Sequence, residues 1–333
     1  MAGVTFSKLS GKTESFYKAV EGVLTEIISD EEKSLNKHDE VLKGIFAMKT
    51  SNKFGERAGG RTSFGNMKPM SEGGVFAKDE IEEGYAKLAI HEPYGLAFTT
   101  THDMVADDNL DDAKMAASEM MDTYKRSRLV AGTNFLVTEG STYTYEGKTY
   151  DKTTGDGKGF FATDHLMKKS ATTQSNVFTN AFGTDDNMLN RLAVLGRNFK
   201  NDSGISIGLT FDTIIIPSNC YALEKTIKSI MASNQIVGSA NNDVNIQKGK
   251  WNLIVDHMWE AASGAEPYIL MASEAQKKYG ALRWITREEL DVRNWIDENT
   301  RNLEWSGRCR FSIMPYMWQG FVLGGASVGT TLS

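Results

Sequence analysis

The stretch EGYAKLAIHEPYGLAFTTTHDMVADDNLDDAKMAASEMMDTYKRSRLVAGTNFLV, residues 83–137, decides the fold. Its first part, residues 85–101, is rich in residues that suit a pleated sheet, and Pro93 predicts an edge strand or a bend there. From Leu110 onward the apolar residues recur mostly at steps of three, four and seven, which is typical of one face of a long helix. These positions are Leu110, Ala113, Ala117, Met120, Met121, Tyr124, Ala131 and Phe135. Acidic residues gather at the start of this segment and basic residues toward its end, as the helix macrodipole favours. The sequence therefore predicts a long spine helix that follows extended strands.

Length and composition narrow the class of protein. At 333 residues the chain is longer than one hydrophobic core usually supports, so we expect two subdomains. A formal net charge of −6 argues against a protein built to bind nucleic acid over a broad surface. The sequence shows neither a signal peptide nor a stretch of transmembrane length, so we expect a soluble cytoplasmic protein without membrane contact. Cys220 and Cys309 lie outside any CxxC pair; free buried thiols are the favoured interpretation, and a disulfide stays open.

An amphipathic helix is predicted near the N-terminus, over residues 13–29, with Thr13 as its N-cap. Its apolar stripe consists of Phe16, Tyr17, Val20, Val23, Leu24, Ile27 and Ile28. A stripe of this kind has to be buried. Either the body of the same subunit or a neighbouring subunit can cover it.

Residues 50–84 are the least compact part of the sequence. Seven glycines are mixed there with Lys53, Arg57, Arg61 and Lys68. A structureless loop of this length is unusual inside a compact domain. One interpretation is a projecting two-stranded flap that a partner stabilises, because isolated hairpins are marginal in water. The other is a disordered surface loop, and composition does not separate the two.

The rest of the chain mixes helices and strands without regular alternation, which favours an α+β fold over a doubly wound sheet. The predicted elements are a Thr/Tyr-rich hairpin at 141–150, helices beginning at Asp185 and Tyr221, strands at 211–216, 251–259 and 268–271, a helix-like charged segment from Thr286 to Thr300, and final strands at 308–318 and 320–325. All six tryptophans lie between Trp251 and Trp318, so we expect much of the aromatic core in the C-terminal part.

A search for reactive groups finds no catalytic constellation. The glycine loop Gly155–Gly159 has neither Walker nor Rossmann spacing, and a flexible loop explains it better. The run Asp107-Asn109-Asp111 lacks the glycine and the final glutamate of a calcium loop. The five histidines form no HxxxH or HExxH pair, and no serine lies in a GxSxG elbow. We therefore predict that the protein is not an enzyme, with no catalytic, cofactor-binding or metal-binding residues.

Several segments together resemble the major capsid protein of tailed phages, most closely the major head subunit of Mu-like and related contractile-tailed phages. They are EGYAKLAIHEPYGLAFTTTHDMVADDNL, the long helix after it, FFATDH, FDTIIIPSNCYALEKTIKSIMASNQIVGSANNDVN, WNLIVDH and a glycine-rich terminal strand. The resemblance covers roughly residues 45–325. The most specific part is the IIIPSN strand with the helix after it and GSANNDVN.

The resemblance implies the capsid-shell fold of the Hong Kong phage type, which encapsulins and the floor of herpesvirus capsids share. It divides the chain into an N-terminal arm at 1–48, an extended β-hairpin loop at 49–88, a peripheral domain with the spine helix at 89–159 and 302–333, and an axial domain at 160–301. The glycine-rich loop then becomes intelligible, because it would lie across a neighbouring subunit. Arg57, Arg61, Phe64 and Lys68 are the candidate inter-subunit contact residues in it.

The function that this resemblance implies is self-assembly into the icosahedral shell that encloses a double-stranded DNA genome. The implied partners are other copies of the chain in pentamers and hexamers, a scaffold protein, a portal and a decoration protein, with DNA enclosed without sequence-specific binding. The implied locations are the virion and, during assembly, the host cytoplasm. The alternatives are an encapsulin-type compartment, a soluble α+β enzyme of unrecognised type, and a tail tube or sheath subunit, which would form an open helical polymer.

Overall fold

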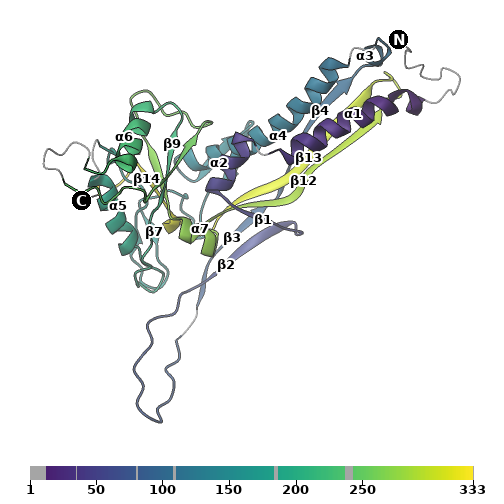
Figure 1. Ribbon diagram of the computed structural model, residues 1–333. Helices are drawn as coiled ribbons and strands as arrows, with labels where there is room; N and C mark the ends of the chain where they lie inside the picture. The colour runs from purple at the N-terminus through teal and green to yellow at the C-terminus, as the bar shows by residue number, and fades with distance from the viewer. Residues whose placement is uncertain are drawn as a thin grey trace.

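The structure is a computed structural model that describes residues 13–34, 36–79, 82–107, 110–183, 187–236 and 243–332. It contains an elongated part, a compact part and a long projecting loop (Figure 1). The side chains of Phe16 and Tyr17, and the capping role predicted for Thr13, lie outside what is described. The run Asp107-Asn109-Asp111 also falls partly outside these ranges.

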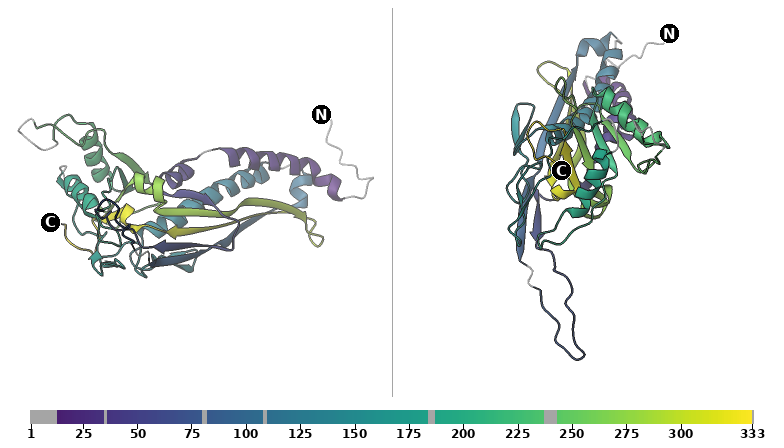
Figure 2. Two further views of the ribbon diagram at one scale, coloured as in Figure 1. Left: turned by 90° about the horizontal axis from the view of Figure 1, so that it is seen from below. Right: turned by 90° about the vertical axis from the view of Figure 1, so that its left-hand side faces the viewer.

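The elongated part is built on a four-stranded sheet in the order β1-β12-β13-β4, called the elongated sheet below. Its strands are β1 (Ala47–Thr50), β12 (Leu282–Ile296), β13 (Leu303–Pro315) and β4 (Glu92–Thr100). Two long helices, α1 (Thr13–Lys33) and α4 (Asp111–Val137), lie along one face of it (Figure 2). The predicted spine helix is therefore confirmed as α4. Pro93 lies in β4 at the edge of the sheet, as predicted, where a missing N–H costs least.

One element of the elongated sheet corrects a sequence prediction. The charged segment Thr286–Thr300, expected to be helical, lies mostly in strand β12. β12 pairs antiparallel with β13 from Leu282↔Pro315 to Ile296↔Leu303, and its first residues also pair with β1. Helix propensity is a weak preference, and pairing with β13 along nearly the whole strand outweighs the preference of Glu and Arg for helix.

The N-terminal region folds onto the spine helix. Val20, Leu24 and Ile28 of α1 are buried, in one cluster with Ala117 and Met121 of α4. Of the two alternatives for the α1 stripe, the body of the same subunit is thus the one observed. The exposed Val23 lies outside this contact, although the sequence pattern includes it.

A second N-terminal helix, α2 (Lys37–Ile45), was not predicted, because its charged sequence reads as the end of α1. Asn36 is its N-cap, and the Asn36 side chain accepts hydrogen bonds from the backbone N–H groups of His38 and Asp39. Asp39 forms a buried ion pair with Arg128 of α4 at 3.7 Å. The arm is therefore attached to the spine helix by both apolar packing and charge.

The compact part contains a second sheet in the order β10-β9-β11-β14. Its strands are β9 (Thr213–Pro217), β10 (Asn252–Asp256), β11 (Tyr268–Met271) and β14 (Phe321–Gly324), and the helices beside it are α5 (Asn187–Asn198), α6 (Tyr221–Ala232) and α7 (Ser273–Tyr279). The predicted strands and the helices at Asp185 and Tyr221 are confirmed to within a few residues. Tyr221 itself is exposed rather than part of the apolar face.

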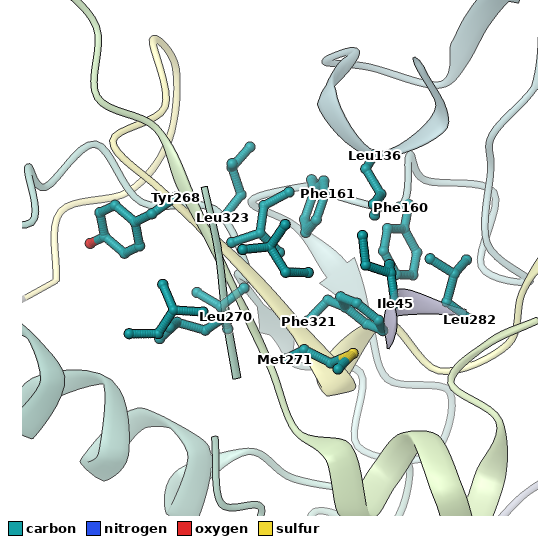
Figure 3. Packing of buried hydrophobic residues seen from close by; sticks show 14 of the residues in the cluster. Ile45, Leu136, Phe160, Phe161, Tyr268, Leu270, Met271, Leu282, Phe321 and Leu323 are labelled. Carbon is teal, nitrogen blue, oxygen red and sulfur yellow. The ribbon is translucent and has the colours of Figure 1, made fainter. Parts of the chain in front are cut away.

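The main core lies between the two parts of the molecule. Ile45 of α2, Leu136 of α4, Leu282 of β12 and Phe321 of β14 point toward one another there (Figure 3). Five of the six tryptophans are buried and Trp295 is half exposed. This packing confirms that the C-terminal part supplies much of the aromatic core.

The sheets do not follow the predicted domain ranges at two places. β12 comes from the range 160–301, yet it lies between β1 and β13 in the elongated sheet. β14 comes from the range 302–333, yet it pairs with β11 in the compact sheet. The chain thus passes between the two parts before β12 and again after β13, at the end of the pair where Leu282 and Pro315 face each other, and no local sequence signal marks either crossing.

The remaining elements are short. They are β2 (Gly55–Arg61), β3 (Glu83–Ile90), α3 (His102–Ala106), β5 (Thr142–Tyr145), β6 (Lys148–Asp151), β7 (His165–Leu166), β8 (Thr173–Gln174) and the 3-10 helix η1 (Trp318–Gly320). β5 and β6 form the predicted Thr/Tyr hairpin. Its turn residues Glu146 and Gly147 both have positive φ, of 47° and 74°, which is the geometry of a type I′ turn.

Candidate inter-subunit contact surfaces

The most prominent surface is the segment between β2 and β3, called the extended loop below and comprising residues 62–82. It projects far from both parts of the molecule (Figures 1 and 2). β2 and β3 pair antiparallel at its root, from Gly55↔Ile90 to Arg61↔Glu83. The predicted flap is therefore observed in part: its root is two-stranded, and residues 62–79 project without strands.

The extended loop exposes large apolar side chains. Met67 is fully exposed, and Val75 and Phe76 are 91% and 81% exposed. Phe64 and Met70 are more than half exposed as well. Several large apolar side chains left exposed on one projecting segment are typical of a surface that another molecule covers.

The four predicted contact residues occupy two places along this loop. Arg57 lies at the root, where its guanidinium pairs with Glu83 across the two strands at 3.2 Å, both side chains being exposed. The backbone of Arg61 also belongs to the root, but its side chain lies outside the described residues. Phe64 and Lys68 lie further out on the loop and are exposed. The structure therefore does not gather the four into one patch.

The sequence reasoning missed Met67, Val75 and Phe76. It followed glycines and basic residues, whereas the structure shows that the loop also exposes several large apolar side chains. The available signal was the presence of methionine and aromatic residues in a stretch too rich in glycine to form its own core.

The root of the extended loop is held by polar contacts with the compact part. Ser203 Oγ donates a hydrogen bond to the carbonyl of Ser63 at 2.7 Å, and Lys168 Nζ donates to the carbonyl of Glu83. Within the loop, the Gly65 N–H donates to the Asp79 carboxylate at 2.5 Å. These contacts fix where the loop leaves the body and leave its outer half uncovered.

A cavity of about 330 Å³ lies beside this root, lined by Tyr85, Asp156 and Asp202 among others. Asp156 accepts a hydrogen bond from His165 at 2.8 Å, and the His165 ring stacks on Trp318. Burial alone would raise the pKa of Asp156, but hydrogen bonds from His165 and Thr154 outweigh it and hold that pKa below its usual range. Burial raises the pKa of Asp202. These groups brace the root, and no nucleophile activated by a base stands among them.

The second surface is the seam between α1 and α4. Lys125 of α4 is buried and donates hydrogen bonds to the carbonyls of Glu31 and Ser34 at 2.5 and 2.7 Å. These are the last carbonyls of α1, which a cation stabilises through the helix dipole. The N-terminal arm is thus attached to its own subunit along this seam.

Other chemical features are accounted for within the fold. Cys220 and Cys309 are free and buried, as predicted, and burial raises the pKa of the Cys309 thiol to about 11. Within the described ranges, no three His, Cys, Asp or Glu side chains are grouped so that they could hold a metal ion. None of the helices in the described part of the chain combines the length and the apolar character that crossing a membrane requires.

Comparison with known proteins finds similarity in structure but none in sequence. No protein-family model matches the sequence, and no curated protein matches it. Solved structures do match. A chain of Gordonia phage Cozz is 11% identical with a TM-score of 0.51, over 88% of this chain and 87% of that one. A chain of Mycobacterium phage Patience is 10% identical with a TM-score of 0.51, over 94% and 87%.

A third match is described as the capsid of an empty GTA particle. It is 11% identical with a TM-score of 0.50 and covers 87% of this chain and 90% of the other. At such identities the matches establish the architecture alone. The elongated sheet with its spine helix, the compact part and the projecting loop together make this chain a protein with the fold of the tailed-phage major capsid proteins.

Proposed function

We propose that this chain is a major capsid protein that self-assembles into the icosahedral shell around a double-stranded DNA genome. The observation that carries the proposal is the extended loop on a capsid-type body. The loop leaves Met67, Val75 and Phe76 uncovered by its own subunit. Burying such side chains stabilises an association by about 1.5–3 kcal/mol each. A neighbouring copy of the chain is the partner that a closed shell supplies at every loop.

In the proposed arrangement, the loop of each subunit contacts one neighbouring subunit of the same pentamer or hexamer. Closed shells need heterologous contacts that repeat around a symmetry axis, and a projecting loop that reaches one neighbour supplies such a contact. Of the four residues predicted from sequence, the exposed Phe64 and Lys68 would contact the neighbour, and Arg57 and Arg61 would act at the β2–β3 root. The division into arm, loop, peripheral domain and axial domain belongs to the same proposal.

The proposed partners beyond the chain itself are a scaffold protein, a portal and a decoration protein. The net charge of −6 supports a wall that encloses DNA without binding it tightly or by sequence. The proposed locations are the virion and, before that, the host cytoplasm where the shell is built.

Negative-stain electron microscopy of the purified chain, paired with its mass from light scattering, tests the proposal. We expect uniform hollow particles whose mass is many times that of one 36.8 kDa chain. If the chain alone stays monomeric or dimeric, we expect particles after co-expression with the scaffold protein. Absence of particles in both experiments would overturn the proposal, and open tubes from every preparation would favour a tail subunit instead.

A further experiment distinguishes a phage shell from an encapsulin-type compartment. Genes for a portal and a terminase beside the coding sequence support the phage shell. A neighbouring enzyme with a short cargo peptide, captured inside the particles on co-expression, would favour the compartment.

A further inference from the structure

The direction of the extended loop is set at one residue. His91 is the single residue between β3, which belongs to the loop hairpin, and β4, which belongs to the elongated sheet. Two strands of different sheets therefore meet at His91, and any swing of the hairpin against the body must change the surroundings of this side chain. The His91 side chain is 1% exposed.

Hydrogen bonds and a small apolar cluster surround His91 at this junction. His91 Nδ1 shares a hydrogen bond with Ser312 Oγ at 2.9 Å, and the His91 N–H donates to the carbonyl of Phe54 at 3.3 Å. Arg310 donates to the His91 carbonyl at 3.3 Å. The buried members of the cluster are Ala58, Ala89, Ile285 and Met314.

This cluster is far smaller than the main core, so little apolar area holds the hairpin against the elongated sheet. Further contacts between hairpin and body are polar: Lys87 of β3 bonds to Asp151 and Thr153, beside the bonds at Ser63 and Glu83 described above.

More positive than negative side chains surround His91. Arg310 of β13 and Arg287 of β12 face it, and Glu56 of β2 is the carboxylate that faces it. His91 Nε2 and Arg310 Nε are both buried and make no hydrogen bond within the described residues. Burial lowers the pKa of His91, Glu56 opposes this effect, and the two arginines add to it. The closed junction therefore favours the neutral imidazole.

We propose that His91 is a pH-sensitive hinge, whose protonation loosens the root of the loop hairpin from the elongated sheet. A proton on the imidazole places a third positive charge beside Arg310 and Arg287 in a buried position. Moving the hairpin outward exposes the imidazolium to water and relieves that repulsion. Mild acid thus frees the loop to change its angle, and neutral pH fixes it. The hinge is a property of the subunit, and its use in adjusting a shell rests on the proposed function.

The direction and size of the pH effect on hinge opening follow from proton linkage. The open hinge takes up a proton near the ordinary histidine pKa of 6.5, whereas the closed hinge takes it up only at lower pH. The population of the open form therefore rises as the pH falls below 6.5, by up to about tenfold per pH unit until the closed form is protonated too. Above pH 7 the population is constant.

Methionine oxidation of the unassembled full chain tests this proposal without requiring shells. Because β2 and β3 bond to each other, their amides stay protected when the hairpin swings, and the side chain to follow is Met314, which is 2% exposed between the hairpin and the elongated sheet. Its oxidation rate by dilute peroxide, read by peptide mass spectrometry, is compared at pH 7.5 and 5.5. We expect this rate to rise by up to about tenfold at pH 5.5, and the rate at Met121, buried between α1 and α4, to stay constant. H91Q, whose amide can still bond to Ser312 but cannot titrate, removes the pH dependence. H102Q, at a half-exposed histidine of α3, keeps it.

Two outcomes overturn the hinge. Either Met314 is oxidised equally fast at pH 7.5 and 5.5 in the unmodified chain, or H91Q shows the same acceleration at pH 5.5 as the unmodified chain does. If H91Q does not fold, R287Q serves instead. Removing one of the two facing cations brings the pKa of the closed hinge toward 6.5, so R287Q must show a smaller pH response, and an unchanged response again refutes the proposal. Failure of the chain to form shells leaves all these results interpretable.

Discussion

The double substitution Met67→Ser and Phe76→Ser in the extended loop bears most directly on the proposed assembly. Both side chains are exposed in the isolated subunit, Met67 fully and Phe76 to 81%. Their replacement should therefore leave the free energy of unfolding of the subunit unchanged within about 0.5 kcal/mol. Burial of both in a neighbouring subunit would contribute about 3 kcal/mol at the lower end for two such side chains.

The lost contact energy converts into a higher subunit concentration needed for assembly. Because each 1.4 kcal/mol changes an equilibrium about tenfold, the double variant needs a subunit concentration about 100-fold higher to assemble to the same extent. Light scattering over a dilution series, under the conditions in which the unmodified chain forms particles, measures this shift. Thermal unfolding of the unassembled subunit checks that the fold is intact.

The matched control is Val328→Ser, which removes an apolar side chain that is 71% exposed but lies near the C-terminus, away from the loop. It should assemble at nearly the same concentration as the unmodified chain. If the double variant also does so, the loop contributes no apolar contact between subunits. If the double variant unfolds at a lower temperature, the loop side chains stabilise their own subunit and the reasoning fails at its first step.

Three further predictions concern stability and charge. Leu24→Ala should lower the free energy of unfolding by about 2–5 kcal/mol in urea titration, because it opens a cavity in the α1–α4 seam. Val23→Ala on the exposed side should change that free energy by less than about 0.5 kcal/mol. Equal effects of the two variants would contradict the packing of α1. Burial lowers the pKa of Lys152 to about 7 from 10.5, so between these pH values the unfolded chain binds more protons than the folded chain. The free energy of unfolding should therefore rise with pH across that window by up to about 1.4 kcal/mol per pH unit. Lys152→Met should lack this rise, and the same pH dependence in the variant and the unmodified chain would refute the role of Lys152. Charge reversal at both Arg57 and Arg61 should block assembly while circular dichroism shows a folded subunit, and normal shells from that variant would remove the loop root from the proposal.

Local sequence signals were sufficient for part of this structure. The spacing of apolar residues from Leu110 onward defines α4, because a helix of that length is fixed by its own periodicity. The strand at Tyr268–Met271 and the hairpin turning at Glu146-Gly147 are likewise encoded within a few residues. In each of these cases the deciding interactions join near neighbours in the chain.

Only the tertiary structure decided the rest. Whether Thr286–Thr300 is helix or strand depends on β13, which pairs with it from outside that segment. The partner of the α1 stripe is α4, about 90 residues away in the chain, as the Lys125 contacts with Glu31 and Ser34 show. His91 shows no distinguishing pattern in the sequence, and its position at the hinge arises because two sheets and two arginines meet around it. Periodicity and turn chemistry act over a few residues, whereas strand pairing, burial and the charge around a side chain depend on residues that folding brings together from distant parts of the chain.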